Sequence, residues 1–128
     1  MDAFIPIVGM TATVLAADAV WLTANMSYHT KLIETIQKSP LTIRAVPAAL
    51  VYVLIIATLY VFAVLESKSL KDAALRGAVL GFAMYGLYDL TNFATLTNYT
   101  LQMTVKDMAW GTVLCATVAV AGFYLKPK

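Results

Sequence analysis

The longest uncharged stretch of the chain is residues 45–65, AVPAALVYVLIIATLYVFAVL. A helix rises about 1.5 Å per residue, so it needs about 20 mostly apolar residues to cross the hydrocarbon core of a bilayer. This stretch is long enough, and it lacks the alternation of polar and apolar residues that marks a strand of a membrane β-barrel. It therefore predicts a transmembrane helix, which we extend at its start to cover residues 41–65.

Three further stretches have the same character. Residues 3–26 contain one charged residue, residues 77–97 contain one, and residues 103–125 contain two adjacent ones near their start. Together with residues 41–65, they predict an all-α integral membrane protein, a single domain built as a bundle of four transmembrane helices.

The polar connection between the first two spans is residues 27–40. Its apolar residues within 30–38 fall at helical spacing, so we expect a short interfacial helix there. Ser39 and Pro40 resemble an N-cap and first turn for the second span. Pro47 has no N–H group for a helical hydrogen bond, so it either kinks that span or marks its true start.

The composition agrees with a membrane protein. The chain of 128 residues is 61% hydrophobic and 12% charged, whereas soluble domains are roughly 45–50% apolar and about 25% charged. A chain this small cannot hide so much apolar surface inside itself. We therefore exclude a soluble enzyme and expect the lipid bilayer as the partner. The net charge of +2 does not indicate nucleic-acid binding, and the single cysteine excludes an internal disulfide.

The distribution of basic residues favours one orientation. Four spans place both termini on the same side as the loop 66–76. That side carries five basic residues and the other side four: Lys68, Lys71, Arg76, Lys126 and Lys128 against Lys31, Lys38, Arg44 and Lys106. The positive-inside rule then predicts that both termini are cytoplasmic.

Three acidic residues interrupt the predicted spans: Asp18, Asp89 and Asp107. The helix rise places Asp18 and Asp89 roughly 18–22 Å from the terminal side, and Asp107 roughly 6 Å from the opposite side. In a core about 30 Å thick, all three fall in the same outer third. Arg44, at the start of the second span, can reach this level with its long side chain.

Polar and aromatic residues share a helix face with each acid. They are Trp21 and Asn25 in the first span, Tyr85, Tyr88 and Asn92 in the third, and Trp110 in the fourth. Ionisable groups in a span usually face the bundle interior, so we expect one polar pocket that opens outward. The acids could be struts satisfied by Arg44, Asn92 and the indoles, or they could bind a ligand or handle a proton. His29, the only histidine, is expected to be solvated at the interface, and no metal site is expected.

Two short patterns leave alternatives open. Gly77 and Gly81 form a small-residue motif that suits either an internal helix contact or a docking face for a homo-oligomer or a larger membrane complex. Asp-x-x-Trp-x-Thr occurs at residues 18–23 and again at residues 107–112. In a four-span bundle the two copies would run in opposite directions, as in an inverted repeat, but the surrounding residues match poorly, which favours chance or convergent packing.

Three segments resemble a known family. They are YGLYDLTN at residues 85–92, DMAWGT at residues 107–112, and Asp18-x-x-Trp21. The chain is similar in these segments to the predicted membrane proteins called domain of unknown function 2177. The resemblance implies a four-span bundle and no particular activity. It emphasises six residues: Asp18, Trp21, Asp89, Asn92, Asp107 and Trp110.

Three functions are compatible with the sequence. The first is a module that binds or transports a proton, a cation or a small cationic ligand at the acids. The second is an accessory subunit of a larger membrane complex. The third is a lipid-modifying enzyme that uses an aspartate and Tyr88 for acid–base chemistry, so catalysis stays an open question, and no motif indicates a cofactor.

Overall fold

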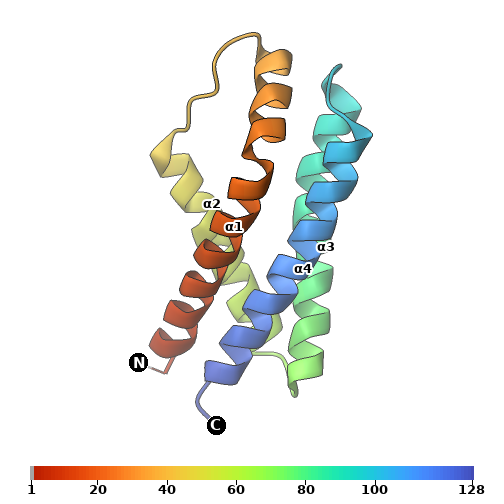
Figure 1. The fold of residues 1–128 in the computed structure, drawn as a ribbon. Helices are drawn as coiled ribbons and strands as arrows, with labels where there is room; N and C mark the ends of the chain where they lie inside the picture. The colour runs from red at the N-terminus through yellow and green to blue at the C-terminus, as the bar shows by residue number, and fades with distance from the viewer. Residues whose placement is uncertain (1) are drawn as a thin grey trace.

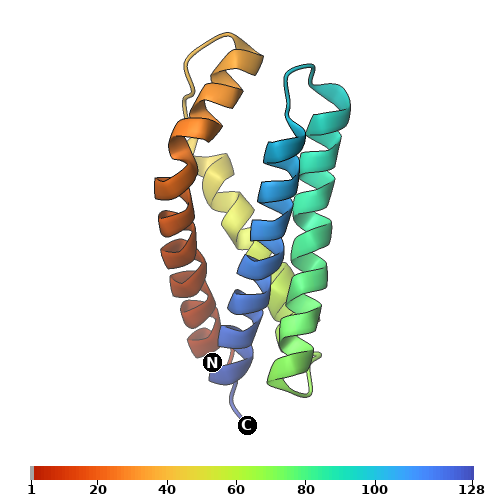
Figure 2. The ribbon, with the colours of Figure 1, turned by 45° about the vertical axis from the view of Figure 1, so that its right-hand side comes forward.

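The computed structural model describes residues 2–128, which form helices and no strand (Figure 1). The helices are α1 (Phe4–Gln37), α2 (Ala45–Leu59), α3 (Leu70–Thr95) and α4 (Leu101–Leu125), and a π-helical segment, η1 (Tyr60–Val64), continues α2. Both termini and the α2–α3 connection lie at one end of the bundle, which we call the terminal end. The other two connections lie at the opposite, distal end (Figures 1 and 2).

The prediction of a separate interfacial helix is wrong, because α1 continues without a break through residues 30–37. No glycine or proline occurs between residues 10 and 39 to interrupt it. Its 34 residues correspond to about 51 Å of helix, longer than the hydrocarbon core of a bilayer. The helix ends at Lys38, which is left-handed (φ 56°, ψ 35°) and whose N–H donates to the carbonyl of Glu34.

Helix α2 begins later than predicted. Ser39 and Pro40 do not start it; they belong to the connection, where their carbonyls accept hydrogen bonds from the side chain of Gln37. The helix begins at Ala45, which makes Pro47 its third residue. The first four N–H groups of a helix have no partner within the helix, so a proline costs little here. Pro47 therefore marks the start of the span.

Helices α3 and α4 form the most extensive helix pair of the bundle. A Cβ atom on Gly77 would lie 2.5 Å from the carbonyl oxygen of Cys115, and one on Gly81 would overlap the carbonyl oxygen of Gly111. The two backbones can approach this closely only because the side chains are missing. The predicted docking face at Gly77 and Gly81 is therefore already occupied by α4, and the motif serves an internal contact.

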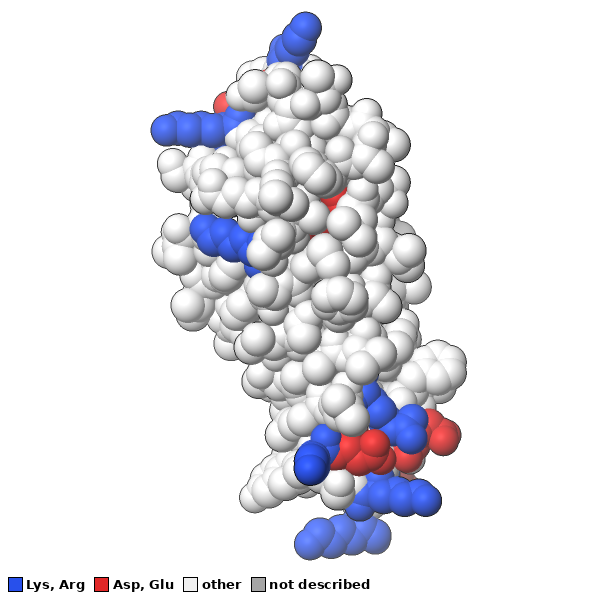
Figure 3. Space-filling model, turned by 90° about the vertical axis from the view of Figure 1, so that its right-hand side faces the viewer, with Lys and Arg blue, Asp and Glu red and all other residues white. Residues whose placement is uncertain are grey.

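The apolar core lies between the helices towards the terminal end and in the middle of the bundle. Its largest fully buried side chains come from α1, from α2 with η1, and from α4: Met10, Val14, Leu59, Val64, Leu114 and Val118. The outer surface is also apolar over most of its length, as the mainly uncharged band between the two ends in Figure 3 shows. Three helices, namely α1, α2 with η1, and α4, are long and apolar enough to cross a membrane.

Candidate functional site

The bundle contains an open cavity of about 480 Å³ to which all four helices contribute side chains. We call it the acid–aromatic cavity. Its polar and aromatic lining consists of Asp18, Trp21, His29, Tyr52, Tyr85, Tyr88, Asp107 and Trp110, and its aliphatic lining of Leu22, Val51, Leu54, Ile55 and Met84. A larger hollow of about 690 Å³ lies at the terminal end, but the α2–α3 connection and the C-terminal residues line it, with no acid.

Asp18 links three helices within the cavity. Its Oδ2 accepts a hydrogen bond of 2.8 Å from the hydroxyl of Tyr52 on α2. Its Oδ1 accepts one of 3.0 Å from the Nε1–H group of Trp110 on α4. Both donors are neutral, so they hold the carboxylate in place without cancelling its charge.

The two tryptophans of the chain stack on each other across the α1–α4 contact. The ring centroids of Trp21 and Trp110 lie 4.7 Å apart, and the ring planes are nearly parallel, at 5°. The amino group of Lys106 lies 5.7 Å from the centroid of Trp21 and equally far from that of Tyr28. This distance is within the range of a cation–π interaction, so the Lys106 side chain rests on aromatic rings, and within residues 2–128 it forms no ion pair with an acid.

Asp89 is completely buried and does not line the cavity. Its Oδ1 accepts a hydrogen bond from the hydroxyl of Tyr99, and its Oδ2 has no donor within residues 2–128. Asp107 lines the cavity and lies close to Asp89 across the α3–α4 contact. Asp89 and Asp107 thus form a carboxyl pair with one member facing the cavity and the other buried outside its lining.

The remaining predicted residues divide into two groups. Tyr85 and Tyr88 line the cavity, whereas Asn92 lies beside Tyr88 and Tyr99 and is not part of the lining. Asn25 does not reach the cavity, because its side-chain amide donates to the carbonyl of Trp21 one helical turn earlier.

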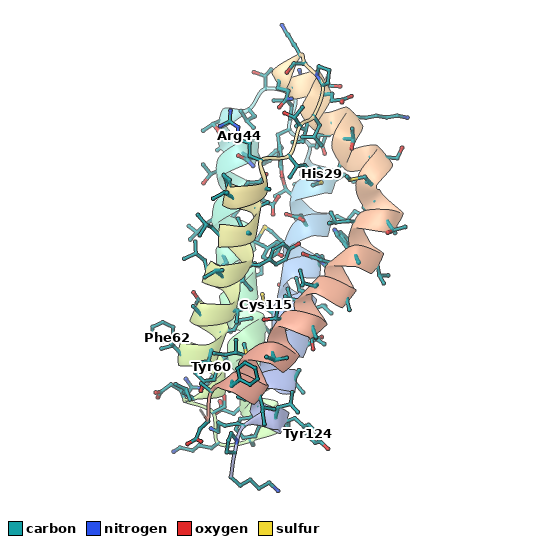
Figure 4. All side chains as sticks on the ribbon, turned by 90° about the vertical axis from the view of Figure 1, so that its left-hand side faces the viewer. His29, Arg44, Tyr60, Phe62, Cys115 and Tyr124 are labelled. Carbon is teal, nitrogen blue, oxygen red and sulfur yellow. The ribbon has the colours of Figure 1, made fainter. Side chains whose placement is uncertain are left out.

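Arg44 does not pair with an acid, contrary to the expectation that it would neutralise one of them. It precedes α2 with an extended backbone (φ −86°, ψ 113°), and its side chain is exposed. Figure 4 places it near the distal end, far along the bundle from Cys115. The one ion pair among residues 2–128 joins Arg76 to Asp72 at the terminal end. The backbone N–H of Lys68 and the guanidinium of Arg76 lower the pKa of Asp72, which lies at the beginning of α3.

Four contributors to the site were not predicted as site residues: His29, Tyr52, Tyr28 and Tyr99. His29, expected to be solvated, lines the cavity instead (Figure 4). The sequence gives a weak indication of Tyr52, because its hydroxyl group is unusual in an otherwise aliphatic span. The sequence gives no indication of Tyr99, because the side chains of a connection between two helices can point in any direction. No group of three His, Cys, Asp or Glu residues suited to a metal ion occurs within residues 2–128.

The cavity residues lie within the part of the chain that matches a family of membrane proteins. No curated protein and no solved structure matches the chain. A family model described as "Predicted membrane protein (DUF2177)" matches residues 3–124, nearly the whole chain. The chain therefore belongs to the DUF2177 family of predicted membrane proteins.

Proposed function

We propose that the acid–aromatic cavity binds a small organic cation that carries an apolar body, such as a lipophilic amine or a quaternary ammonium compound. The observation that carries the proposal is that two carboxyl groups, Asp18 and Asp107, share the cavity with five aromatic side chains, while no Lys or Arg within residues 2–128 forms an ion pair with either acid.

The electrostatics favour a positive ligand. A carboxylate inside a membrane protein is costly unless a cation or hydrogen bonds compensate it. Asp18 has two neutral donors and no counter-ion. A bound cation would supply the missing charge, and the tyrosine rings that line the cavity would add cation–π attraction.

The size and openness of the cavity favour an organic molecule. Ligand pockets typically measure about 300–1,000 Å³ and are mostly apolar with a few polar groups, a description that fits this cavity of about 480 Å³. Four lining residues also remain exposed to the outside of the bundle: Leu22, Val51, Leu54 and Tyr88. An apolar ligand could therefore enter through the flank of the bundle, between the helices.

We further propose that all four helices cross the membrane, α3 included. The average hydropathy of α3 is reduced by polar residues and glycines that face inward, among them Gly77, Gly81 and the completely buried Asp89. Its outward face is apolar: Leu75, Val79, Phe82, Leu87, Leu90 and Phe93 are all exposed. A helix with this pattern is stable in lipid beside α4. The small excess of basic residues at the terminal end favours cytoplasmic termini.

Binding can be followed with the protein's own tryptophans, because the only two in the chain both line the cavity. Purified protein in lipid nanodiscs is titrated with benzyltrimethylammonium and, separately, with neopentylbenzene, which has the same shape without the charge. We expect saturable fluorescence changes for the cation and affinity at least tenfold lower for the neutral analogue. A desolvated cation–π contact contributes about 2 kcal/mol or more, which corresponds to roughly 30-fold or more in affinity.

The variant Asp18→Asn keeps the shape of the side chain and removes its charge. We expect it to lose at least tenfold in affinity for benzyltrimethylammonium. Asp72→Asn is the matched control, because that acid pairs with Arg76 at the terminal end and should leave affinity unchanged. Equal binding of the cation and its neutral analogue, or an unaffected Asp18→Asn variant, would overturn the proposal.

A further inference from the structure

We propose that Asp89 and Asp107 hold a single proton between them, and that a cation entering the acid–aromatic cavity displaces this proton. The second half of the proposal rests on the proposed function, whereas the first stands on the carboxyl pair alone. Together they make the cavity a site of proton–cation exchange.

The geometry of Asp89 requires a donor that the rest of the protein does not supply. The side chain is completely buried, and the Tyr99 hydroxyl satisfies Oδ1. Oδ2 is buried with no donor within residues 2–128. An acceptor left in this state costs about 1–3 kcal/mol, and more if it is charged. Asp107 lies close to Asp89 across the α3–α4 contact, so a proton held between the two acids would give the vacant oxygen a donor.

Electrostatics lead to the same conclusion. Two carboxylates in contact within a low-dielectric interior repel each other strongly, so the pair retains one proton unless a cation is near. No Lys or Arg within residues 2–128 forms an ion pair with either acid. The pair therefore carries one negative charge rather than two.

The charges of other titratable groups near the pair affect how strongly the proton is held. Helix α1 contributes Asp18 and His29, α2 contributes Tyr52, α3 contributes Tyr85 and Tyr88, the α3–α4 connection contributes Tyr99, and α4 contributes Lys106. Asp18 adds a second negative charge and favours retention of the proton. Lys106 and a protonated His29 act in the opposite direction, but neither forms an ion pair with the two acids.

The position of Asp107 couples the proton to the ligand. Asp107 lines the cavity, so a cation bound there stabilises the ionised form of the pair. The proton bound by Asp89 and Asp107 then leaves to solvent, and of the two resulting carboxylates Asp107 faces the new positive charge. Because such coupling is reciprocal, a proton on the pair weakens cation binding. Affinity should rise with pH, by up to about tenfold per pH unit where one proton is released per cation.

Infrared spectroscopy tests the shared proton without any ligand. At neutral pH the protein in lipid should show the C=O stretching band of a protonated carboxyl group, shifted in D₂O. The band should disappear in Asp89→Asn and in Asp107→Asn and persist in Asp18→Asn. Two single variants are used because either may perturb folding, which circular dichroism will reveal. No such band in the wild-type protein, or a band that persists in both variants, would overturn the shared proton.

Calorimetry tests the exchange. Benzyltrimethylammonium is titrated into the protein in two buffers of different ionisation enthalpy, which gives the number of protons released per bound cation. We expect up to one proton for the wild-type protein and close to none for Asp89→Asn, which still binds the cation. Binding without proton release would overturn the exchange and leave the proposed function standing. No binding at all would overturn the proposed function and the exchange together, and the infrared band alone would then decide the shared proton.

Discussion

The close approach of α3 and α4 can be tested with two glycine substitutions on the same helix. In Gly81→Ala the new methyl group would overlap the backbone carbonyl oxygen of Gly111 and lie 2.6 Å from the Cβ of Cys115. Backbone atoms cannot move aside alone, so the helices must separate. In Gly86→Ala the nearest atom is the terminal methyl of Met108, at 3.1 Å, which can rotate away. Both glycines are buried, which makes them a matched pair.

The two substitutions are expected to change the free energy of unfolding in opposite directions. Overpacking a well-packed interior costs about 1–3 kcal/mol, whereas replacing a helical glycine by alanine gains roughly 0.5–1 kcal/mol in an unstrained position. We therefore expect Gly81→Ala to lower the free energy of unfolding by about 1–2 kcal/mol. Gly86→Ala should leave it unchanged or raise it by up to about 1 kcal/mol.

Reversible unfolding of the protein in mixed micelles with increasing SDS, followed by circular dichroism, measures both free energies. The same contact positions the cavity, because the ring of Tyr85 lies where a side chain on Gly111 would be. Gly81→Ala should therefore also weaken binding of benzyltrimethylammonium. If the two variants unfold within about 0.5 kcal/mol of each other, well inside the difference expected from overpacking, the α3–α4 contact described here is wrong.

Two further predictions concern the site and the topology. Tyr52→Phe removes the hydroxyl that donates to Asp18 and should lower the free energy of unfolding by about 1–2 kcal/mol, measured in the same micelles. Tyr60→Phe, a hydroxyl removed from the same span, is its control, and a similar loss in both would show that the bond to Asp18 contributes nothing. In intact cells a membrane-impermeant maleimide should label Thr97→Cys at the distal end, and Lys71→Cys at the terminal end only after permeabilisation. Labelling of both positions in intact cells would contradict the proposed crossing of α3. The native cysteine, Cys115, is buried, so the maleimide is expected to react only with the introduced cysteines.

Sequence patterns predicted the helical class well, because long apolar stretches leave few alternatives in a bilayer. They failed at the α1–α2 connection. The polar composition of residues 27–37 indicates that the chain leaves the membrane there, but composition does not say whether the helix ends. Since no glycine or proline interrupts this segment, the helix continues into the polar region as far as Gln37.

The candidate site was predictable where helical geometry constrains it. The helix rise and the faces of the spans indicate that Asp18, Tyr85, Asp107 and Trp110 should meet, and the structure brings them together in one cavity. Arg44 could not be placed in this way, because a residue just before a helix has no face imposed on it. Tyr99 was also beyond prediction, since its hydrogen bond to Asp89 depends on the conformation of a short connection.

Binding of an organic cation in the acid–aromatic cavity can be observed by locating the bound ligand. The most direct measurement uses 4-bromobenzyltrimethylammonium in crystals of the lipid-embedded protein, with the bromine located by anomalous scattering. We expect one strong peak inside the cavity, close to Trp21, Tyr85 and Trp110, that is absent from crystals of Asp18→Asn. A peak found only on the lipid-facing surface of the helices, or none at a saturating concentration, would contradict the claim.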